Sequence, residues 1–254
     1  MYKAEFSIKL LTIAGAHRPI SWSSFFTKTL YNIFTIFVII LLQSFNISLF
    51  MNLTLHSLND IDDLAESLCW SLAAFIISAK MTNFLLRRED IIKLIRILSE
   101  DCLKTRNNKE KIIQDKCDFT AIWNTKYFVI TSYATALAMT LGELTKGKNN
   151  ISLPIKASFP YDYNQRLAFC LTYISQCVTI YFSAFITIAS ESFVMTMLIQ
   201  ICSQLDIISH RLQCLSHLYR SNIKSIIFNE SEEAKIIKNC IMQHNYVYIS
   251  LCYV

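Results

Sequence analysis

The stretch YNIFTIFVIILLQSFNISLFMNL, residues 31–53, decides the fold class. It lies inside a run of 31 positions, between Lys28 and Asp60, that carries no charged residue. The hydrocarbon core of a bilayer is about 30 Å thick and needs roughly 20 helical residues to cross it. The run therefore predicts a membrane-spanning helix at about 30–54.

The rest of the chain has the same character. Of its 254 residues 53% are hydrophobic and 17% charged, whereas about 25% charged residues are usual in soluble domains. Three glycines and three prolines disfavour a turn-rich β architecture. We predict an all-α, polytopic transmembrane helical bundle with further spans at about 64–86, 124–144 and 166–190, a cytoplasmic helical extension at 191–244 and the start of a fifth span at 245–254.

Basic residues predict the orientation. When the Lys and Arg residues are assigned to alternate sides of the four spans, 20 fall on one side and four on the other. The basic side of a membrane protein is cytoplasmic, so we expect a cytoplasmic N-terminus, and outer loops at 55–63 and 145–165. The basic cytoplasmic segments then account for the net charge of +5, and no nucleic-acid partner is predicted.

Two charged residues fall within or beside the spans. Lys80 precedes Arg87 by seven residues, so we expect its amine to snorkel to the inner interface. Glu191 is placed at the cytoplasmic boundary. A role of either residue in an ion pathway is the alternative.

The cytoplasmic segments have helical periodicity. The apolar positions after the fourth span repeat every three or four residues, which favours a helix that packs on a partner helix or another subunit; they are Leu205, Ile208, Leu212, Leu215 and Leu218. The segment 89–104 has the same pattern, and a solvated helix at the membrane surface is the alternative interpretation.

Motifs for catalysis and metal binding are weak. The sequence has no phosphate loop and no hydrolase or metalloprotease signature, so no enzyme and no cofactor are predicted. His210, Cys214 and His217 share a helix face but lack an evident fourth ligand, and Cys240 with His244 is a similar pair, so no metal is predicted. A disulfide between Cys69 and Cys170, near the outer ends of two spans, is left open.

Aromatic and soft side chains gather in the outer halves of the spans. Such side chains suit a pocket for a small apolar ligand, with a few polar groups to orient it; packing and interfacial anchoring are the alternative roles. The candidates are Trp70, Phe75, Tyr133, Met139, Phe169, Tyr173, Gln176 and Tyr181. Asn52 and Asn150 begin candidate glycosylation motifs near or in the outer loops.

Three segments together resemble the insect odorant receptor family. LLTIAGAHRPISWSS (10–24) resembles the N-terminal pattern of receptors from ants, bees and wasps, although His17 stands where a Trp is usual. LPIKASFPYDY (153–163) with LAFCLTYISQ (167–176) resembles the second outer loop and the start of helix four. AKIIKNCIMQHNYVYI (234–249) resembles the segment that leads into helix five.

The resemblance implies a seven-helix subunit of an odorant-gated cation channel, assembled with an obligate odorant co-receptor in the plasma membrane of olfactory sensory neurons. It implies a pocket for small apolar odorants in the outer half of the bundle. Pro154, Phe159, Pro160 and Tyr161 would then form the pocket-rim loop. Because family members are longer, the chain is expected to be C-terminally truncated, without the pore-lining helix.

Three other functions stay open on the sequence alone. A gustatory-type receptor would share the topology. A small polytopic transporter would use Lys80 and Glu191 to line a path. A non-conducting membrane partner would assemble with channel subunits through its cytoplasmic helices.

Overall fold

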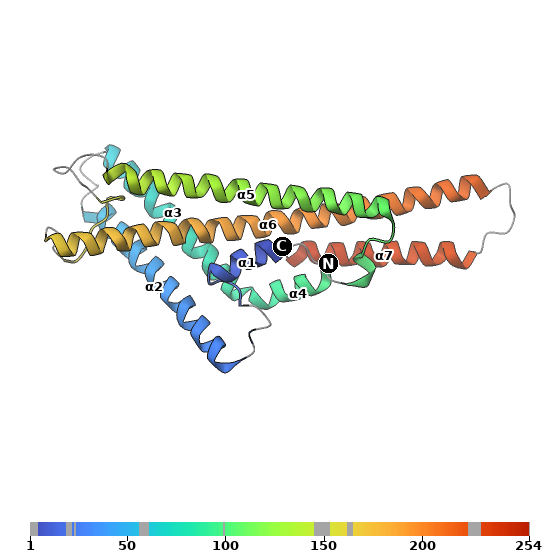
Figure 1. Ribbon diagram of the computed structural model, residues 1–254, viewed down its shortest axis with the longest axis horizontal. Helices are drawn as coiled ribbons and strands as arrows, with labels where there is room; N and C mark the ends of the chain where they lie inside the picture. Colours follow the sequence, from blue (N-terminus) through green and yellow to red (C-terminus); the bar gives the residue numbers. More distant parts are fainter. Residues whose placement is uncertain are drawn as a thin grey trace. The chain divides into compact units, whose positions relative to one another are not determined.

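The computed structural model is helical throughout its regular structure (Figure 1). It describes residues 5–18, 22, 24–55, 61–98, 100–144, 153–161, 165–222 and 230–253. The elements in chain order are α1 (Glu5–Ile13), α2 (Phe25–Leu55), α3 (Ile61–Leu86), α4 (Arg88–Leu98), the short 3-10 helix η2 (Asp101–Leu103), α5 (Asn108–Leu144), α6 (Arg166–Asn222) and α7 (Glu230–Tyr253).

The chain forms two compact units. We call Ile8–Leu86 with Lys126–Glu191 the membrane unit. We call Met1–Ser7, Arg87–Thr125 and Ser192–Val254 the polar unit. α5 and α6 contribute residues to both units, and the units are described separately below.

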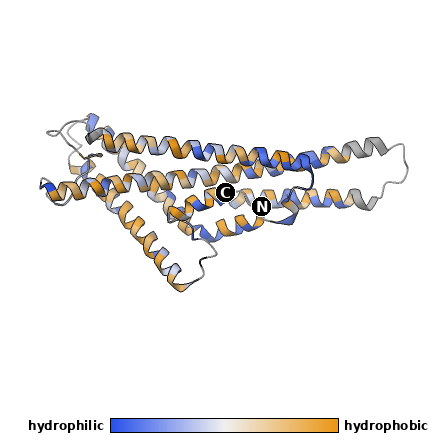
Figure 2. Cartoon of the chain, in the orientation of Figure 1, coloured by the Kyte–Doolittle hydropathy of each residue, from blue (hydrophilic) through white to orange (hydrophobic). Residues whose placement is uncertain are grey.

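Three helices among the described residues are long and apolar enough to cross a membrane. They are Phe25–Leu55, Ile61–Leu86 and Arg166–Leu215. The outward face of α2 is made of Ile and Phe side chains that are 52–62% exposed, including Ile33, Phe37 and Phe50. Figure 2 shows α2 as an almost continuous apolar helix. Such a surface is unusual in water and suits lipid contact.

The expected span at 124–144 lies in α5, which is not among these three helices. Its apolar side chains are interrupted by threonines, and that lowers its hydropathy. The hydroxyl groups of Thr131, Thr135 and Thr140 each donate a hydrogen bond to the carbonyl four residues earlier. A hydroxyl bonded in this way needs no water, so crossing by α5 stays a prediction.

α2 packs along α3 in the membrane unit through polar contacts as well as apolar ones. The Asn46 amide donates to the Ser78 hydroxyl at 2.6 Å, and the Asn52 amide donates to the Ser67 hydroxyl at 3.0 Å. Amide and hydroxyl groups often join helices in this way within membranes.

The corner between α1 and α2 depends on Gly15. Its φ of +80° is a conformation that L residues with a Cβ adopt at a cost, and a Cβ here would lie 3.3 Å from Phe34 Cε1. The Gly15 carbonyl accepts a bond from Thr35, and the Thr12 carbonyl accepts one from Tyr31. His17, at the position where the resemblance expects Trp, is buried in the same corner.

Lys80 and Glu191 form an ion pair within the membrane unit. The expectation that the Lys80 amine reaches the inner interface stays a prediction, because the ion pair shows the partner of the amine and not its depth in the membrane. A carboxylate on α6 satisfies the amine on α3 directly, so each charge reduces the cost of the other in lipid.

The polar unit has a small apolar core and a larger buried polar one. Leu103, Ile201, Ile208 and Val247 form the apolar cluster. α4 buries Ile91 and Leu94 and lies against α7.

The apolar face predicted after residue 200 is buried only in part within the chain. Ile208 is buried in the apolar cluster, whereas Leu205 and Leu212 are exposed, and Gln204 and Arg211 are buried. The interpretation of this face as packing on another helix of the chain is wrong at these two leucines. Packing on another subunit stays a prediction.

Hydrogen-bonded buried side chains of the polar unit form a row, which we call the buried polar row. It is centred on Arg211 and Glu110, whose side chains are 6% and 2% exposed. Arg211 donates to both carboxylate oxygens of Glu110, at 2.9 and 2.8 Å, and also to Gln243 Oε1 and the Lys104 carbonyl. The backbone N–H of Arg106 donates to Glu110 Oε2 at 2.7 Å. Burial opposes ionisation of Glu110, but the bonds from Arg211 and Arg106 outweigh it and lower the pKa of its carboxyl.

The row continues through amides. Gln243 donates to Gln204, and Gln204 donates to Gln114. Gln114 and Gln200 both donate to Asp118 Oδ1. α5, α6 and α7 are thus joined by one hydrogen-bonded chain, whose members fix the register of the three helices.

Candidate ligand-binding site

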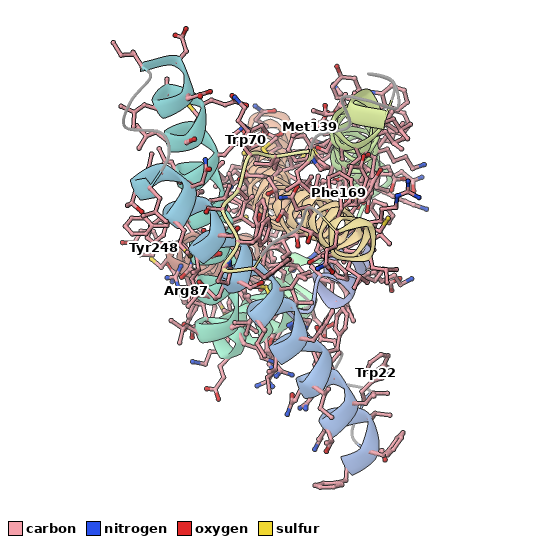
Figure 3. The ribbon with its side chains drawn as sticks, turned by 90° about the vertical axis from the view of Figure 1, so that its left-hand side faces the viewer. Trp22, Trp70, Arg87, Met139, Phe169 and Tyr248 are labelled. Atoms are coloured by element: carbon pink, nitrogen blue, oxygen red, sulfur yellow. The ribbon has the colours of Figure 1, made fainter. Side chains whose placement is uncertain are left out.

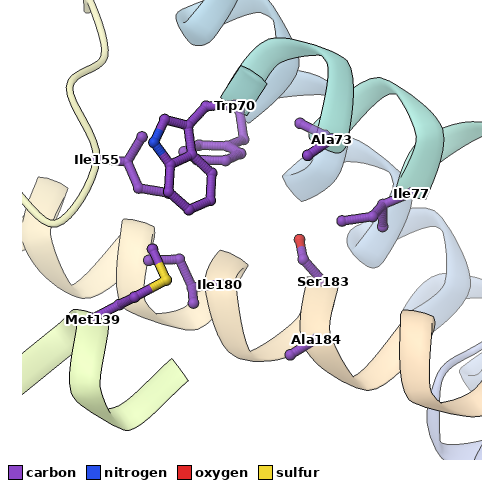
Figure 4. Close-up of a pocket in the computed structure, with 10 residues that line it drawn as sticks. Trp70, Ala73, Ile77, Met139, Ile155, Ile180, Ser183 and Ala184 are labelled. Carbon is purple, nitrogen blue, oxygen red and sulfur yellow. The ribbon is translucent and has the colours of Figure 1, made fainter. Parts of the chain in front are cut away.

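An apolar cavity of about 160 Å³, which we call the inner cavity, lies inside the membrane unit (Figure 4). Four helices and the loop before α6 supply its walls, which are Phe45, Trp70, Ala73, Ala74, Ile77, Met139, Ile155, Ile180, Ser183 and Ala184. An apolar cavity of about 150 Å³ in another protein stays dry and binds benzene. The inner cavity is therefore suited to a small, mainly hydrocarbon ligand.

A second cavity of about 370 Å³, the outer cavity, lies in the same unit. It is bordered by α2, by the loop and by α6, and its lining residues are Ser44, Phe45, Ile47, Ser48, Met51, Phe159, Pro160, Tyr161, Ser175, Gln176 and Thr179. Phe45 borders both cavities. The outer cavity carries several hydroxyl groups, in contrast to the inner one.

The loop 153–161 is attached to three helices. The buried Gln176 amide of α6 donates to the Ile155 carbonyl at 3.1 Å and accepts from the Ile155 N–H at 3.3 Å. The Ser48 hydroxyl of α2 donates to the Ser158 carbonyl at 2.8 Å, and the Ser158 N–H donates to the Ser48 carbonyl at 3.2 Å. Lys156 pairs with Asp63 and Glu66 of α3.

The charged attachment is the most exposed of the three. Lys156 Nζ lies 2.6 Å from Asp63 and 3.4 Å from Glu66, with about half or more of each side chain exposed. Both carboxylates raise the pKa of the Lys156 amine, through hydrogen bonds first. Exposed pairs of this kind contribute little to stability.

Several tyrosines form a layer behind the cavities. The rings of Tyr133 and Tyr181 stack with centroids 6.1 Å apart, and the Tyr181 hydroxyl lies 3.2 Å from the Thr140 hydroxyl. Tyr173 donates to the Thr140 carbonyl and packs on Phe169. Hydrogen bonds to Thr140 of α5 hold the rings of Tyr173 and Tyr181, and Tyr181 packs against the apolar cluster that includes Ile180.

The structure thus distributes the predicted binding residues over three places. Trp70 and Met139 line the inner cavity, and Figure 3 labels both together with Phe169. The candidates that line the outer cavity are Gln176 and three residues of the predicted rim, namely Phe159, Pro160 and Tyr161. Tyr133, Phe169, Tyr173 and Tyr181 lie in the layer behind, and Pro154 lines neither cavity. Phe75 is 66% exposed on the outer face of α3.

The sequence reasoning missed Phe45, Ile155, Ile180 and the small residues. Ala73 and Ala74 on α3 and Ala184 on α6 create the space into which the larger side chains project. Adjacent alanines in a span are the sequence signal that could have indicated a void rather than tight packing.

The structure describes some of the remaining candidate sites, which are those for glycosylation, a disulfide and a metal. Asn52 lies within α2, and its amide is bonded to Ser67, whereas Asn150 lies outside the described residues. Cys69 and Cys170 are free thiols. Among the side chains that the structure describes, which do not include that of His217, no three His, Cys, Asp or Glu groups are placed to hold a metal.

We expect Gln176→Leu to loosen the loop much more than Lys156→Met. The leucine leaves the buried N–H and carbonyl of Ile155 without partners, at about 1–2 kcal/mol, whereas the exposed Lys156 pairs contribute less than about 1 kcal/mol. Thermal unfolding of the purified protein and the rate of proteolytic cleavage near residue 156 measure both effects. Equal sensitivity of the two variants would contradict this ranking of the attachments.

These features define a multi-pass helical membrane protein with an apolar cavity beneath a tethered loop. The chain belongs to the 7tm odorant receptor family, whose sequence profile matches residues 60–252.

Solved structures with a similar fold are the insect olfactory receptor OR5 from Machilis hrabei, with and without eugenol. The eugenol complex has a TM-score of 0.76 at 16% identity, and the other structure has 0.74 at 17%. Both alignments cover 98% of this chain, which spans 63% of the length of the solved receptor. Among curated proteins no sequence matches the chain significantly.

Proposed function

We propose that the chain is an odorant receptor subunit that binds small apolar odorants in the inner cavity. The observation that carries this proposal is the cavity itself, a closely lined apolar space with the Ser183 hydroxyl and the Trp70 indole as its polar groups. The OR5 complex with eugenol supports it, because a receptor of the same fold binds a small aromatic molecule.

We further propose that odorant binding gates a cation channel that the subunit forms with an odorant co-receptor. Family membership supports this role, with the N-terminus in the cytoplasm and the protein in the plasma membrane of olfactory sensory neurons. Co-expression with an insect odorant co-receptor, with current recorded during odorant pulses, tests gating. A co-receptor that gives the same odorant-evoked current without this chain would contradict it.

The transporter alternative is weaker. Lys80 and Glu191, the two charges on which it depended, are paired with each other. Their pairing accounts for both charges without a transport path.

Ligand binding is testable with a single tryptophan. The chain has three, and replacing Trp22 and Trp123 with Phe leaves Trp70, which borders the inner cavity, as the reporter. We expect a saturable change in Trp70 emission with members of a panel of small aromatic odorants that includes eugenol. Ala73→Phe fills the cavity, and we expect the affinity to fall at least about tenfold, or about 1.4 kcal/mol, because the added ring occupies the volume that the ligand needs.

Ala79→Phe is the matched control, since Ala79 is exposed on the same helix and lines neither cavity. It should bind as the parent does. Unchanged affinity in Ala73→Phe, with Ala79→Phe also unchanged, would contradict the inner cavity as the odorant site.

A further inference from the structure

Three of the hydroxyl groups that line the outer cavity donate their protons to backbone carbonyls of the protein. Ser44 donates to the Leu41 carbonyl at 2.9 Å, Ser48 to the Ser158 carbonyl at 2.8 Å and Thr179 to the Ser175 carbonyl at 2.8 Å. A hydroxyl oxygen has two acceptor lone pairs in addition to its single proton. Each of these groups can therefore accept a hydrogen bond from a ligand while keeping its own bond.

A chain of hydrogen bonds leaves the Tyr161 hydroxyl as an acceptor too. The Thr172 hydroxyl donates to the Ala168 carbonyl at 2.7 Å, which uses its single proton. The Tyr161 hydroxyl lies 2.8 Å from the Thr172 hydroxyl and must therefore be the donor between them. The phenol oxygen of Tyr161 then presents only lone pairs to the outer cavity.

The rest of the wall is mainly apolar, with Ser175 and Gln176 as the other polar lining residues. Phe45, Ile47, Met51 and Phe159 offer a surface for a hydrocarbon chain or ring. Ile47 is also exposed on the outward face of α2, so the outer cavity borders the surface that suits lipid. The walls combine a set of acceptor oxygens with hydrocarbon, in a volume of about 370 Å³.

We propose that the outer cavity is a second binding site, for amphiphiles that carry one hydroxyl group. The ligand O–H donates to the acceptor oxygens, and its hydrocarbon part lies along Phe45 and Met51. An ether or ester of the same shape has no O–H to donate. When it displaces water from the cavity, the acceptor oxygens lose their hydrogen bonds to water and gain none from the ligand. The source of the hydroxyl is either a free alcohol or a membrane sterol, which share this chemistry.

The second site does not rest on odorant binding in the inner cavity. It has one consequence for that cavity, because Phe45 borders both. A ligand that moves the Phe45 ring changes the affinity of the other cavity, and the change is the same in both directions.

The test is photolabelling of the whole chain in phosphatidylcholine nanodiscs. The probes are a long-chain alcohol that carries a diazirine and the methyl ether of the same compound. We expect the alcohol to label peptides with residues 44–51 and 159–161, saturably, and the ether to label them about tenfold less, as one lost hydrogen bond predicts. Equal labelling by the two probes would overturn the proposal.

A double variant locates the acceptors. Tyr161→Phe with Ser44→Ala removes two of the acceptor oxygens and leaves the Thr172 bond to Ala168 in place, so alcohol labelling should fall towards the level of the ether. Ser183→Ala, which removes the hydroxyl of the inner cavity, is the control and should label as the parent does. Undiminished labelling in the double variant would also overturn the proposal.

Two further readings separate the possibilities. Cholesterol added to the nanodiscs should compete with the alcohol if the natural ligand is a sterol, and should have no effect if it is a free alcohol; either result supports a hydroxyl site. Labelling confined to peptides of the inner cavity would refute the second site. Emission of Trp70 reports separately on the inner cavity, so failure of one proposal is distinguishable from failure of the other.

Discussion

Arg211→Met is expected to destabilise the protein by about 3–5 kcal/mol, because the substitution leaves the buried carboxylate of Glu110 without its cation. It also removes the donor to Gln243 and to the Lys104 carbonyl. The double variant Arg211→Met with Glu110→Leu should recover most of this loss, since it buries no unpaired charge. Denaturant unfolding of the purified protein, followed by circular dichroism, measures the differences.

An exposed pair in the same unit is the control. Lys104 and Asp101 are three residues apart with most of each side chain in solvent, so Asp101→Asn should change stability by about 0.5 kcal/mol or less. A double variant as unstable as Arg211→Met alone would show that the unpaired charge is not the cause.

The same pair predicts how stability depends on pH. The folded state lowers the pKa of Glu110 below its ordinary value of 4.5. Its contribution is therefore complete above the ordinary value and is lost as the pH falls through the depressed folded value. Glu110→Gln should show a shallower loss of stability than the parent below about pH 4.5, and parallel acid curves would contradict this assignment.

Lys80→Met is expected to destabilise the protein by up to about 2.5–3.5 kcal/mol, because that range applies to an uncompensated charge at the centre of a membrane helix and is an upper limit nearer the boundary. Glu191 would then face the membrane unit without its cation. The charge exchange Lys80→Glu with Glu191→Lys restores an ion pair between α3 and α6. We expect it to recover most of the thermal stability in detergent and most of the yield of membrane-inserted protein.

A matched variant isolates the charge. Lys28 lies near the start of α2 and forms no ion pair among the described residues, so Lys28→Met removes a cation of the same kind without stranding an anion. It should cost less than about 0.5 kcal/mol. If the charge exchange proved as damaging as Lys80→Met, the pair would not be the source of the stabilisation.

The fold was largely readable from the apolar runs. The apolar run after Lys28 is helical as far as Leu55, because a helix satisfies the backbone of an uncharged segment within lipid. The hydropathy of α5 was harder to interpret, since its threonines are polar by type but bonded to their own helix. The α1–α2 corner at Gly15 was not predicted, and the burial of His17 there depends on tertiary packing.

The polar unit shows where periodicity fails. Leu205 and Leu212 suggested the buried face of α6, yet Arg211 and Gln204 occupy it. A partner more than 100 residues away, Glu110, makes burial of Arg211 favourable, and no local pattern contains that information. The pairing of Lys80 with Glu191 could not be predicted for the same reason, because the two residues are 111 positions apart in the sequence.

Residue type predicted part of the lining of the inner cavity, but not which aromatic residues belong to it. Trp70 and Met139 line this cavity, as expected for aromatic and soft side chains in a span, and their contact with a ligand stays a prediction. Tyr133 and Tyr181 have the same composition yet stack on each other behind the wall. Whether a ring faces a void depends on the small residues opposite, such as Ala184, and thus on how helices face each other.

The three attachments of the loop 153–161 lower the number of atoms that a ligand needs in order to bind beside it. Small ligands gain at most about 1.5 kcal/mol per non-hydrogen atom, and usually much less. A molecule of about ten such atoms could not also bear the entropy of ordering a nine-residue segment, at about 1–2 kcal/mol for each residue. Because Gln176, Ser48 and Asp63 already hold that segment, we expect a small ligand of the proposed site to bind without ordering the loop.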